Sequence, residues 1–279
     1  MTSAVIQQPA ANAAVLERDT RPVFVRLLLT TPGLIVARLL ILGSLVGLWQ
    51  YASGRWAPEF WISSPTAIAA QIGRWFEDGS IWPHFRATLT AMVSGYVLGC
   101  ISGVGLGLIL GFIPGAYRVV SPFMAALYSL PKVALAPLFV IVLGIDIESK
   151  IALVTITVFF LVLYSTLDGV RAVDKDFVQS FHLMGATRRE TATKLLIPYA
   201  RPWIFSGMRI AVRYALTAAI LGELIAANRG MGYLIEFNAG QFKATGVFAA
   251  VVLLAVFCVA LTEILTRFEG SVKSGVRVQ

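Results

Sequence analysis

Histidine, cysteine and charged side chains are all scarce in this sequence. Its 279 residues include two histidines and two cysteines, and only 14% are charged, whereas a soluble globular domain is about a quarter charged. His84 and His182 are too isolated to form a metal cluster, and no metal site is predicted. No GxxxxGK[ST] motif occurs, so we expect this chain to bind no nucleotide through a phosphate-binding loop.

The sequence is instead rich in apolar side chains. It is 57% hydrophobic, with a mean hydropathy of +0.78. Apolar runs long enough to cross a bilayer as a helix recur along the chain. Cys100 and Cys258 lie inside such runs, where packing is a better interpretation than a disulfide. The sequence therefore predicts an all-α, polytopic membrane protein, and the net charge of +8 is interpreted as the basic residues of cytosolic loops rather than a nucleic-acid surface.

Six membrane spans are predicted between two tails. The N-terminal tail covers residues 1–33, the transmembrane domain covers 34–268, and the C-terminal tail covers 269–279. The spans lie at about 34–51, 87–112, 119–145, 150–167, 203–226 and 245–265. Lysine and arginine are in excess in the loops that share a side with both termini, which predicts that both termini are cytosolic.

Two segments between the spans have patterns of their own. In the loop after the first span, Ser64-Pro65 is typical of a helix start, and apolar residues from Ile68 to Phe76 follow at helical spacing. Four of the six tryptophans lie in this loop, so we predict a short helix on the membrane surface. The glycine-containing segment 228–243 is predicted to dip into the protein.

The second and third spans carry unusual glycine and proline patterns. In the second span, five glycines recur at every fourth position: Gly95, Gly99, Gly103, Gly107 and Gly111. Glycines at this spacing line one face of a helix and predict close helix packing. In the third span, Pro122, Pro131 and Pro137 predict bends of the kind that border a cavity.

Charged residues inside the predicted spans are few. They include Lys132, Arg209 and Arg213, with Glu223 near the end of the fifth span and Glu263 near the end of the sixth. One interpretation is that they pair with one another for structural reasons. The other is that the basic residues face a pathway and favour an anionic solute.

The polar loop between the fourth and fifth spans, residues 173–198, is the stretch best placed to meet a soluble partner. Phe177, Phe181 and Met184 are spaced by four and then three, which predicts a short amphipathic helix ended by Gly185. A second helix is predicted over 187–196 and is expected to stop before Pro198. Phe181 and Met184 are predicted to insert into a groove on a partner.

This loop resembles the inner-membrane permease subunit of ABC importers of the nitrate, sulfonate and taurine type. The family signature is EAA, three residues, Gly, nine residues and Ile-x-Leu-Pro. Here Gln179-Ser180-Phe181 replaces the EAA triplet, and Gly185 and Leu195-Leu196-Ile197-Pro198 follow at the same intervals. Further similarities occur at Ser129–Leu138, Gly207-Met208-Arg209, Gly222-Glu223 and Arg229–Ile235, so the resemblance covers residues 63–268.

The resemblance implies a type I importer permease fold and a set of partners. A cytosolic coupling helix between spans 4 and 5 would contact a separate ABC ATPase dimer through Gln179, Ser180, Phe181, Met184, Gly185 and Ala186. ATP and magnesium would bind that ATPase, and no cofactor is expected on this chain. A periplasmic solute-binding protein and a second permease copy, forming a homodimer in the bacterial inner membrane, are the other implied partners.

The resemblance also implies what this subunit does. It would import a small, anionic solute by alternating access and would not itself be an enzyme. The alternative is a secondary transporter driven by an ion gradient, for which an inverted repeat is expected but not found. An intramembrane enzyme is the other alternative, and neither histidine lies where its catalytic residues are needed.

Overall fold

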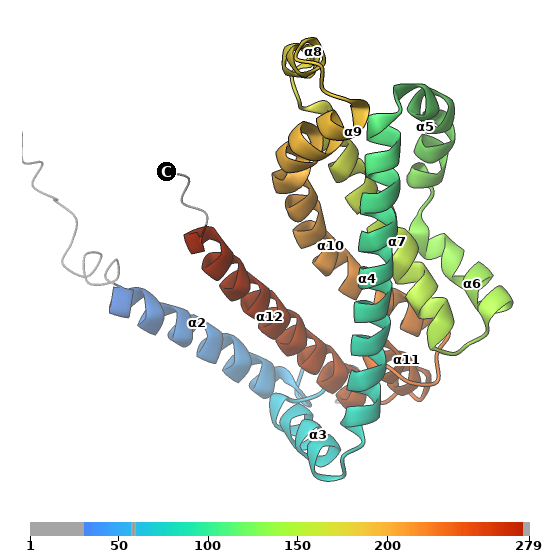
Figure 1. The fold of residues 1–279 in the computed structure, drawn as a ribbon. Helices are drawn as coiled ribbons and strands as arrows, with labels where there is room; N and C mark the ends of the chain where they lie inside the picture. Colours follow the sequence, from blue (N-terminus) through green and yellow to red (C-terminus); the bar gives the residue numbers. More distant parts are fainter. Residues whose placement is uncertain (1–30, 57, 59, 276–279) are drawn as a thin grey trace, which may run out of the picture. The chain divides into compact units, whose positions relative to one another are not determined.

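The structure is a computed structural model that describes residues 31–56, 58 and 60–275, and the described regular elements are all helical. The predicted N-terminal tail up to residue 30 and residues 276–279 lie outside the described residues. The helices are α2 (Thr31–Ala52), α3 (Pro65–Glu77), α4 (Ile81–Phe112), α5 (Pro114–Ser129), the 3-10 helix η1 (Lys132–Leu135), α6 (Ala136–Leu143), α7 (Ile147–Arg171), α8 (Lys175–Leu183), α9 (Arg188–Glu190), the π-helix η2 (Thr191–Leu196), α10 (Ile197–Ile225), α11 (Met231–Gly240) and α12 (Ala244–Gly275) (Figure 1).

Among the described residues, five helices are long and apolar enough to cross a membrane, or six when one bent pair is counted as a single span. α2 is one of them and forms a unit separate from the rest of the chain. The bent pair corresponds to the predicted third span. Its two halves meet at 87°, and the break falls at Leu130-Pro131. The middle proline of that span therefore breaks the helix outright, because proline fixes its own φ and has no N–H to donate.

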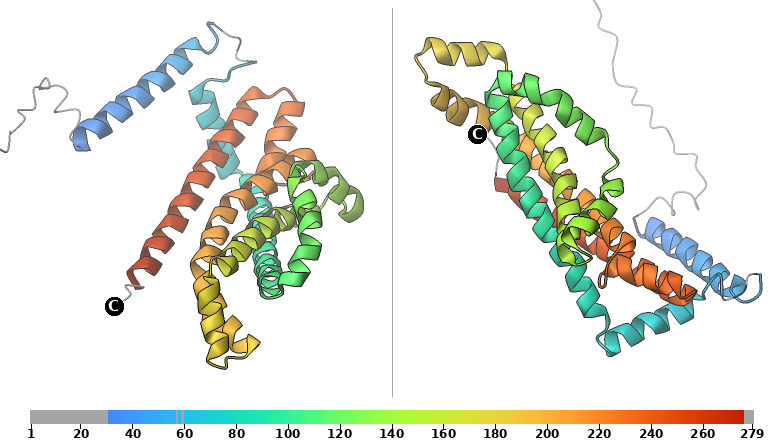
Figure 2. Two further views of the ribbon diagram at one scale, coloured as in Figure 1. Left: turned by 90° about the horizontal axis from the view of Figure 1, so that it is seen from above. Right: turned by 90° about the vertical axis from the view of Figure 1, so that its right-hand side faces the viewer.

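The periodic glycines of α4, from Gly95 to Gly111, face α7. An added Cβ at Gly95 would meet Val154, at Gly99 it would meet Val158, and the series continues through Gly103 to Gly107 and Gly111, which face Val162, Thr166 and Val170. Residue numbers rise together on both helices, so α4 and α7 run parallel. The chain between them must therefore return to the end at which α4 begins, and the bent α5–α6 pair makes that return (Figure 2).

α10 packs antiparallel to α7. A Cβ at Gly207 would overlap the Ser165 side chain, and one at Gly222 would lie 3.3 Å from Leu153. The three helices enclose a core built from small side chains, in which Val154, Val158, Val162, Ala211, Ala215 and Ala219 have essentially no exposed surface. Small residues allow this close approach of helix backbones, which is how helices associate in a bilayer.

α10 is longer than the sequence predicts. The second helix of the polar loop was expected to stop before Pro198, but α9, η2 and α10 form one continuous helix from Arg188 to Ile225. The turn just before Pro198 is the π-helix η2. The wider π turn relieves the clash between the proline ring and the preceding carbonyls, and Pro198 needs no N–H partner there. The prediction of a helix end was therefore wrong.

α3 and α11 lie at the end of the bundle opposite α8 (Figure 1). α3 begins as predicted, with the Ser64 hydroxyl accepting a hydrogen bond from the Ala67 N–H at 3.3 Å. The predicted dip of segment 228–243 contains α11, whose Met231 and Leu234 are buried with Ile81 and Ala250. α11 is thereby packed between the start of α4 and the start of α12.

Candidate functional site

α8 forms an exposed knob at the end of the bundle where α7 ends and α10 begins (Figure 1). It begins at Asp174, whose carboxylate accepts a hydrogen bond from the Asp176 N–H at 2.9 Å. It ends at Gly185, which has φ +81°. The Gly185 N–H donates to the His182 backbone carbonyl, and the Ala186 N–H donates to the Phe181 backbone carbonyl, both at 3.0 Å. These two bonds are the Schellman motif, in which glycine is favoured because a Cβ disfavours positive φ.

The next helical turn is fixed by its own side chains. The Thr187 hydroxyl accepts from the Glu190 N–H at 3.3 Å, and the Glu190 carboxylate accepts from the Thr187 N–H at 3.0 Å. This reciprocal pair is a capping box, which satisfies donors at a helix start. Lys194 adds a salt bridge to Glu190 at 2.9 Å. The end of α8 before Gly185 and the start of α9 after Thr187 are therefore both fixed by hydrogen bonds.

The predicted contact residues of the knob divide into two groups. Gln179, Ser180, Met184 and Gly185 are exposed, whereas Phe181 and Ala186 are half-buried. Phe181 therefore does not project as freely as its place in the apolar pattern suggested. The residue that the sequence pattern missed is Leu183, which is 82% exposed, and it is accompanied by Met184 at 73% and Phe177 at 60%.

The predicted intramembrane charges lie in different places. Lys132 is half-buried at the break between α5 and α6, where its Nζ donates to the Tyr128 carbonyl at 2.5 Å and lies 4.0 Å from the centre of the Tyr128 ring. Arg209 and Arg213 lie one turn apart on the exposed side of α10. The face of α10 that packs against α7 is instead lined by small residues such as Ala211 and Ala215.

Glu223 is buried and has hydrogen-bond donors on two other helices. Its Oε2 accepts from the Thr88 hydroxyl of α4 at 3.0 Å and from the Gly232 N–H of α11 at 2.9 Å. The Thr88 oxygen in turn accepts from the Met231 N–H at 2.8 Å. The carboxylate also lies where a Cβ at Gly230 would be. Glu223 therefore joins α10, α4 and the start of α11, which fits a structural role for this charge.

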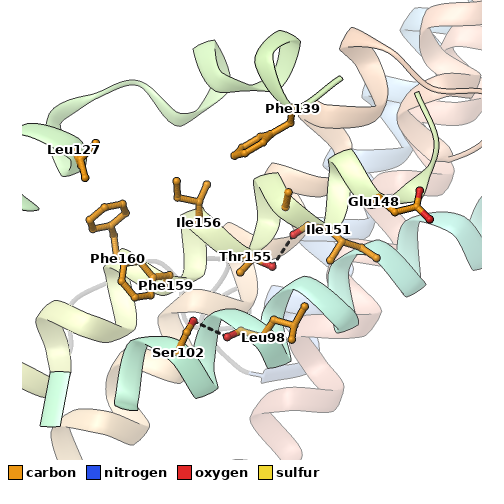
Figure 3. A pocket seen from close by; sticks show the side chains of 11 residues that line it. Leu98, Ser102, Leu127, Phe139, Glu148, Ile151, Thr155, Ile156, Phe159 and Phe160 are labelled. Carbon is orange, nitrogen blue, oxygen red and sulfur yellow. Dashed lines mark hydrogen bonds between the residues drawn. The ribbon is translucent and has the colours of Figure 1, made fainter. Parts of the chain in front are cut away.

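An apolar groove of about 640 Å³ lies between α4, α7 and the bent α5–α6 pair (Figure 3). Its walls include Leu98, Phe139, Ile156 and Phe160. The hydroxyls of Ser102 and Thr155 donate to carbonyls of their own helices, to Leu98 and Ile151, at 2.7 Å each. The hydroxyl hydrogens of Ser102 and Thr155 are therefore bonded to the backbone of their own helices and do not point to the groove as donors. Across the described part of the chain, no group of three metal-ligating side chains occurs.

These features define a polytopic helical membrane protein that presents the capped helix α8 outside its spans. The family description "Binding-protein-dependent transport system inner membrane component" matches residues 103–274. The chain belongs to this family. It is therefore a multi-pass inner-membrane subunit of an ABC importer, a translocation subunit rather than an enzyme, and it works with an ABC ATPase and a binding protein.

Individual relatives differ in the solute that their names give. The formylaminopyrimidine transport permease protein of Halalkalibacterium halodurans is 31% identical over 81% of this chain and 90% of its own length. The taurine transport system permease protein of Escherichia coli is 31% identical over 71% and 74%. The riboflavin transport system permease protein of Chloroflexus aurantiacus is 29% identical over 77% and 82%.

The fold is shared with a solved transporter structure. An inward-facing structure of the MetNI methionine ABC transporter matches with a TM-score of 0.57. The match covers 70% of this chain and 98% of that chain, at 19% sequence identity. This likeness supports the fold predicted from the sequence resemblance, that of a type I importer permease.

Proposed function

We propose that α8 is the coupling helix through which this permease binds its ABC ATPase. The observation that carries the proposal is the group of exposed apolar side chains on the knob, Phe177, Leu183 and Met184. A partner that covered these side chains would gain binding energy, since burying one leucine side chain contributes about 1.5–3 kcal/mol. ATP and magnesium would then bind the ATPase partner and not this chain.

The helices offer a direct route from this contact to the far end of the bundle. α8 is joined through Gly185 to the continuous helix 188–225, which packs along α7. The other end of that helix carries Glu223, which is hydrogen-bonded to α11. Movement of the knob would therefore displace α10 and, with it, the packing of α11. This is the alternating access that we propose for the subunit.

We further propose that two copies of the chain form the permease, with both termini and α8 on the cytosolic side. The excess of lysine and arginine in the loops on that side supports this orientation. The end of the bundle with α3 and α11 would then face the binding protein. Cross-linking of the purified complex through single cysteines, combined with its mass, would test the homodimer. A complex containing two different permease chains would contradict it.

For the solute we propose a small anion. Arg209 and Arg213 are exposed on α10 at a spacing of four residues, outside its contact with α7. The Escherichia coli relative is named for taurine and a Bacillus subtilis relative, 27% identical over 78% of this chain, for aliphatic sulfonates, and both solutes bear a negative sulfonate group. Other relatives are named for riboflavin and formylaminopyrimidine. The two arginines support the anionic class, because cations in a low-dielectric pathway attract anions.

The coupling proposal is tested by co-purification of the ATPase with Leu183→Gln. Leu183 is the most exposed of the knob's apolar residues, so its replacement should leave the fold unchanged. Loss of its burial should weaken ATPase binding by about tenfold or more. His182→Gln, an exposed polar neighbour on the same helix, is the matched control and should retain the ATPase. Equal retention of the ATPase by both variants would refute the coupling role of α8.

The solute proposal is tested by ATP-driven uptake in proteoliposomes that contain the assembled complex. Arg213→Ala should lower the uptake of sulfonates, and Arg213→Lys should restore part of it because the positive charge is kept. Thr217→Ala, on the same exposed side of α10, is the control. Full uptake by Arg213→Ala and Arg209→Ala, with normal ATPase assembly, would contradict the assignment of an anionic solute.

A further inference from the structure

A second pocket lies between α3, α11 and the start of α12. These helices meet at the end of the bundle opposite α8 (Figure 1). Its volume is about 690 Å³. Two cations line it, Arg74 and Lys243, together with the rings of Phe60, Phe237 and Phe242. Of the described residues that line it, none is acidic. The pocket therefore combines positive charge with an aromatic wall, and neither the coupling helix nor the arginines of α10 take part in it.

Phe242 has an unusual backbone conformation in this pocket. Its N–H donates to the Ala239 backbone carbonyl at 3.0 Å, and the Lys243 N–H donates to the Asn238 backbone carbonyl at 2.9 Å. α11 therefore ends in a Schellman motif. Phe242 occupies the position that Gly185 occupies after α8, and its φ is +55°. Positive φ is unfavourable for a bulky residue and is a true outlier. The turn by itself would be better formed with glycine.

The strained turn directs the Phe242 ring to the pocket. The ring stacks on Phe60 with a centroid distance of 6.2 Å and an interplanar angle of 20°. The residue nevertheless remains 73% exposed. A buried packing role therefore does not explain the aromatic side chain. Backbone strain of this kind is typical of ligand-binding positions.

The residues around the pocket are of the kinds found at the depth of phospholipid headgroups. Lys243 directly precedes the membrane-spanning part of α12, which begins at Ala244. Trp56 and Trp61, in the loop before α3, are 72% and 69% exposed, and tryptophan favours the membrane–water boundary. Cations, exposed tryptophans and the start of a span at one level are typical of the membrane interface.

The two cations are placed to hold a phosphate group. The Arg74 guanidinium donates to the Gln71 side-chain oxygen at 2.5 Å, which fixes its orientation. A guanidinium has five N–H donors, so this bond leaves others for phosphate oxygens. Asp78, a nearby carboxylate at the end of α3, is not among the lining residues and accepts a hydrogen bond from the Ser80 N–H at 2.8 Å.

We propose that this pocket binds the headgroup of an anionic phospholipid. Arg74 and Lys243 contact the phosphate oxygens, and the rings of Phe60, Phe237 and Phe242 pack against the glycerol and the first carbons of the acyl chains. The lipid would join α3 to α11 and α12 at the membrane surface. This site shares no residue with α8 or with the arginines of α10.

The test compares nanodiscs of phosphatidylcholine alone with nanodiscs that also contain phosphatidylglycerol. The measurements are the melting temperature and the phosphatidylglycerol retained in native mass spectra. The double variant Arg74→Gln/Lys243→Gln should bind phosphatidylglycerol at least about tenfold more weakly than the wild type. The control, Arg86→Gln/Arg229→Gln, changes two arginines that line a separate cavity between α4, the start of α7 and the segment after α10, and it should bind phosphatidylglycerol normally.

Phe242→Gly separates binding from folding. It removes the strain of the turn, so the variant should be at least as stable as the wild type in phosphatidylcholine, and it should lose the additional stability that phosphatidylglycerol provides. Equal retention of phosphatidylglycerol by the wild type and the Arg74/Lys243 variant would overturn the proposal. An equal rise in melting temperature with inorganic phosphate would assign the pocket to a free oxyanion. Weaker docking of the binding protein with unchanged lipid retention would assign it to that protein.

Discussion

Replacing Gly99 by alanine should force α4 and α7 apart. An added Cβ would lie 2.7 Å from the Val158 Cβ and 2.8 Å from the Thr155 carbonyl oxygen, whereas non-bonded carbon atoms prefer about 3.5–4.0 Å. Neither neighbour can rotate away, because a Cβ and a carbonyl oxygen are fixed to the helix backbone. The two backbones must therefore separate, and overpacking of this kind costs about 1–3 kcal/mol.

Gly105→Ala is the matched control on the same helix. A Cβ at Gly105 meets nothing within 4 Å, and replacing glycine by alanine inside a helix stabilises it by about 0.5–1 kcal/mol. Both variants gain this helix propensity, so they should differ in stability by the overpacking cost alone, about 1–3 kcal/mol. At about 2–4 °C for each kcal/mol, the melting temperature of Gly99→Ala should be roughly 2–12 °C lower than that of Gly105→Ala.

The assay is thermal unfolding of the purified protein in detergent, followed by tryptophan fluorescence. Equal melting temperatures for the two alanine variants would refute the close approach of α4 to α7. A second variant makes the test sharper. Val158→Ala should not rescue Gly99→Ala, because the Val158 Cβ and the Thr155 carbonyl both remain. Rescue would show that removable side-chain atoms, not the backbone, limit the contact.

Three other predictions follow from single contacts. Gly207→Ala should destabilise the α7–α10 pair by about 1–3 kcal/mol. Ser165→Gly should rescue it, because the next atom that a Cβ at Gly207 would meet is the Val162 Cα at 3.8 Å. A melting temperature for the double variant as low as that of Gly207→Ala would contradict this. Gly185→Ala should lose co-purified ATPase while Gly185→Asn retains more of it, because asparagine tolerates positive φ better than alanine; equal amounts for the two would count against the role of the turn. Thr88→Val should leave the Met231 N–H without its acceptor at a cost of about 1–3 kcal/mol, and hydrogen exchange in α11 should then be faster than in the Thr90→Val control; unchanged exchange would show that the bond does not hold α11.

The glycine repeat illustrates how far the sequence could predict the fold. The four-residue period of Gly95 to Gly111 correctly identified the face of α4 that packs closely. It could not identify α7 as the neighbour or show that the two helices are parallel. Those facts depend on α7, where Val154, Val158, Val162, Thr166 and Val170 recur at the same four-residue spacing as the glycines. Such spacing marks one face of a helix, but side chains of this size occur on lipid-facing surfaces as well, so the spacing alone does not name the neighbouring helix. The direction of α7 instead follows from the bent span that returns the chain.

The knob shows a similar limit at the candidate site. Gly185 was predicted to end α8, and the structure places it at a positive φ after that helix. The apolar spacing of Phe177, Phe181 and Met184 predicted one face, but α8 packs that side partly against η2. Phe181 is therefore half-buried, and Leu183 projects instead. An apolar pattern predicts which side chains are buried against another surface, but not whether that surface belongs to the same chain.

The prediction that a helix ends before Pro198 was wrong because it considered the proline without the turn that precedes it. Proline normally ends a helix because it clashes with the carbonyl four residues earlier. Here the six residues before Ile197 form a π-helix, and the helix passes through both Pro198 and Pro202. As a result, the capping box at Thr187 and the buried Glu223 lie on one uninterrupted helix. A helix that ended before Pro198 would have placed a flexible joint between the knob and the span. The continuous helix removes that joint, so a partner that displaced α8 would act on α10 through the short link 184–187 and a single helix from Arg188 onward.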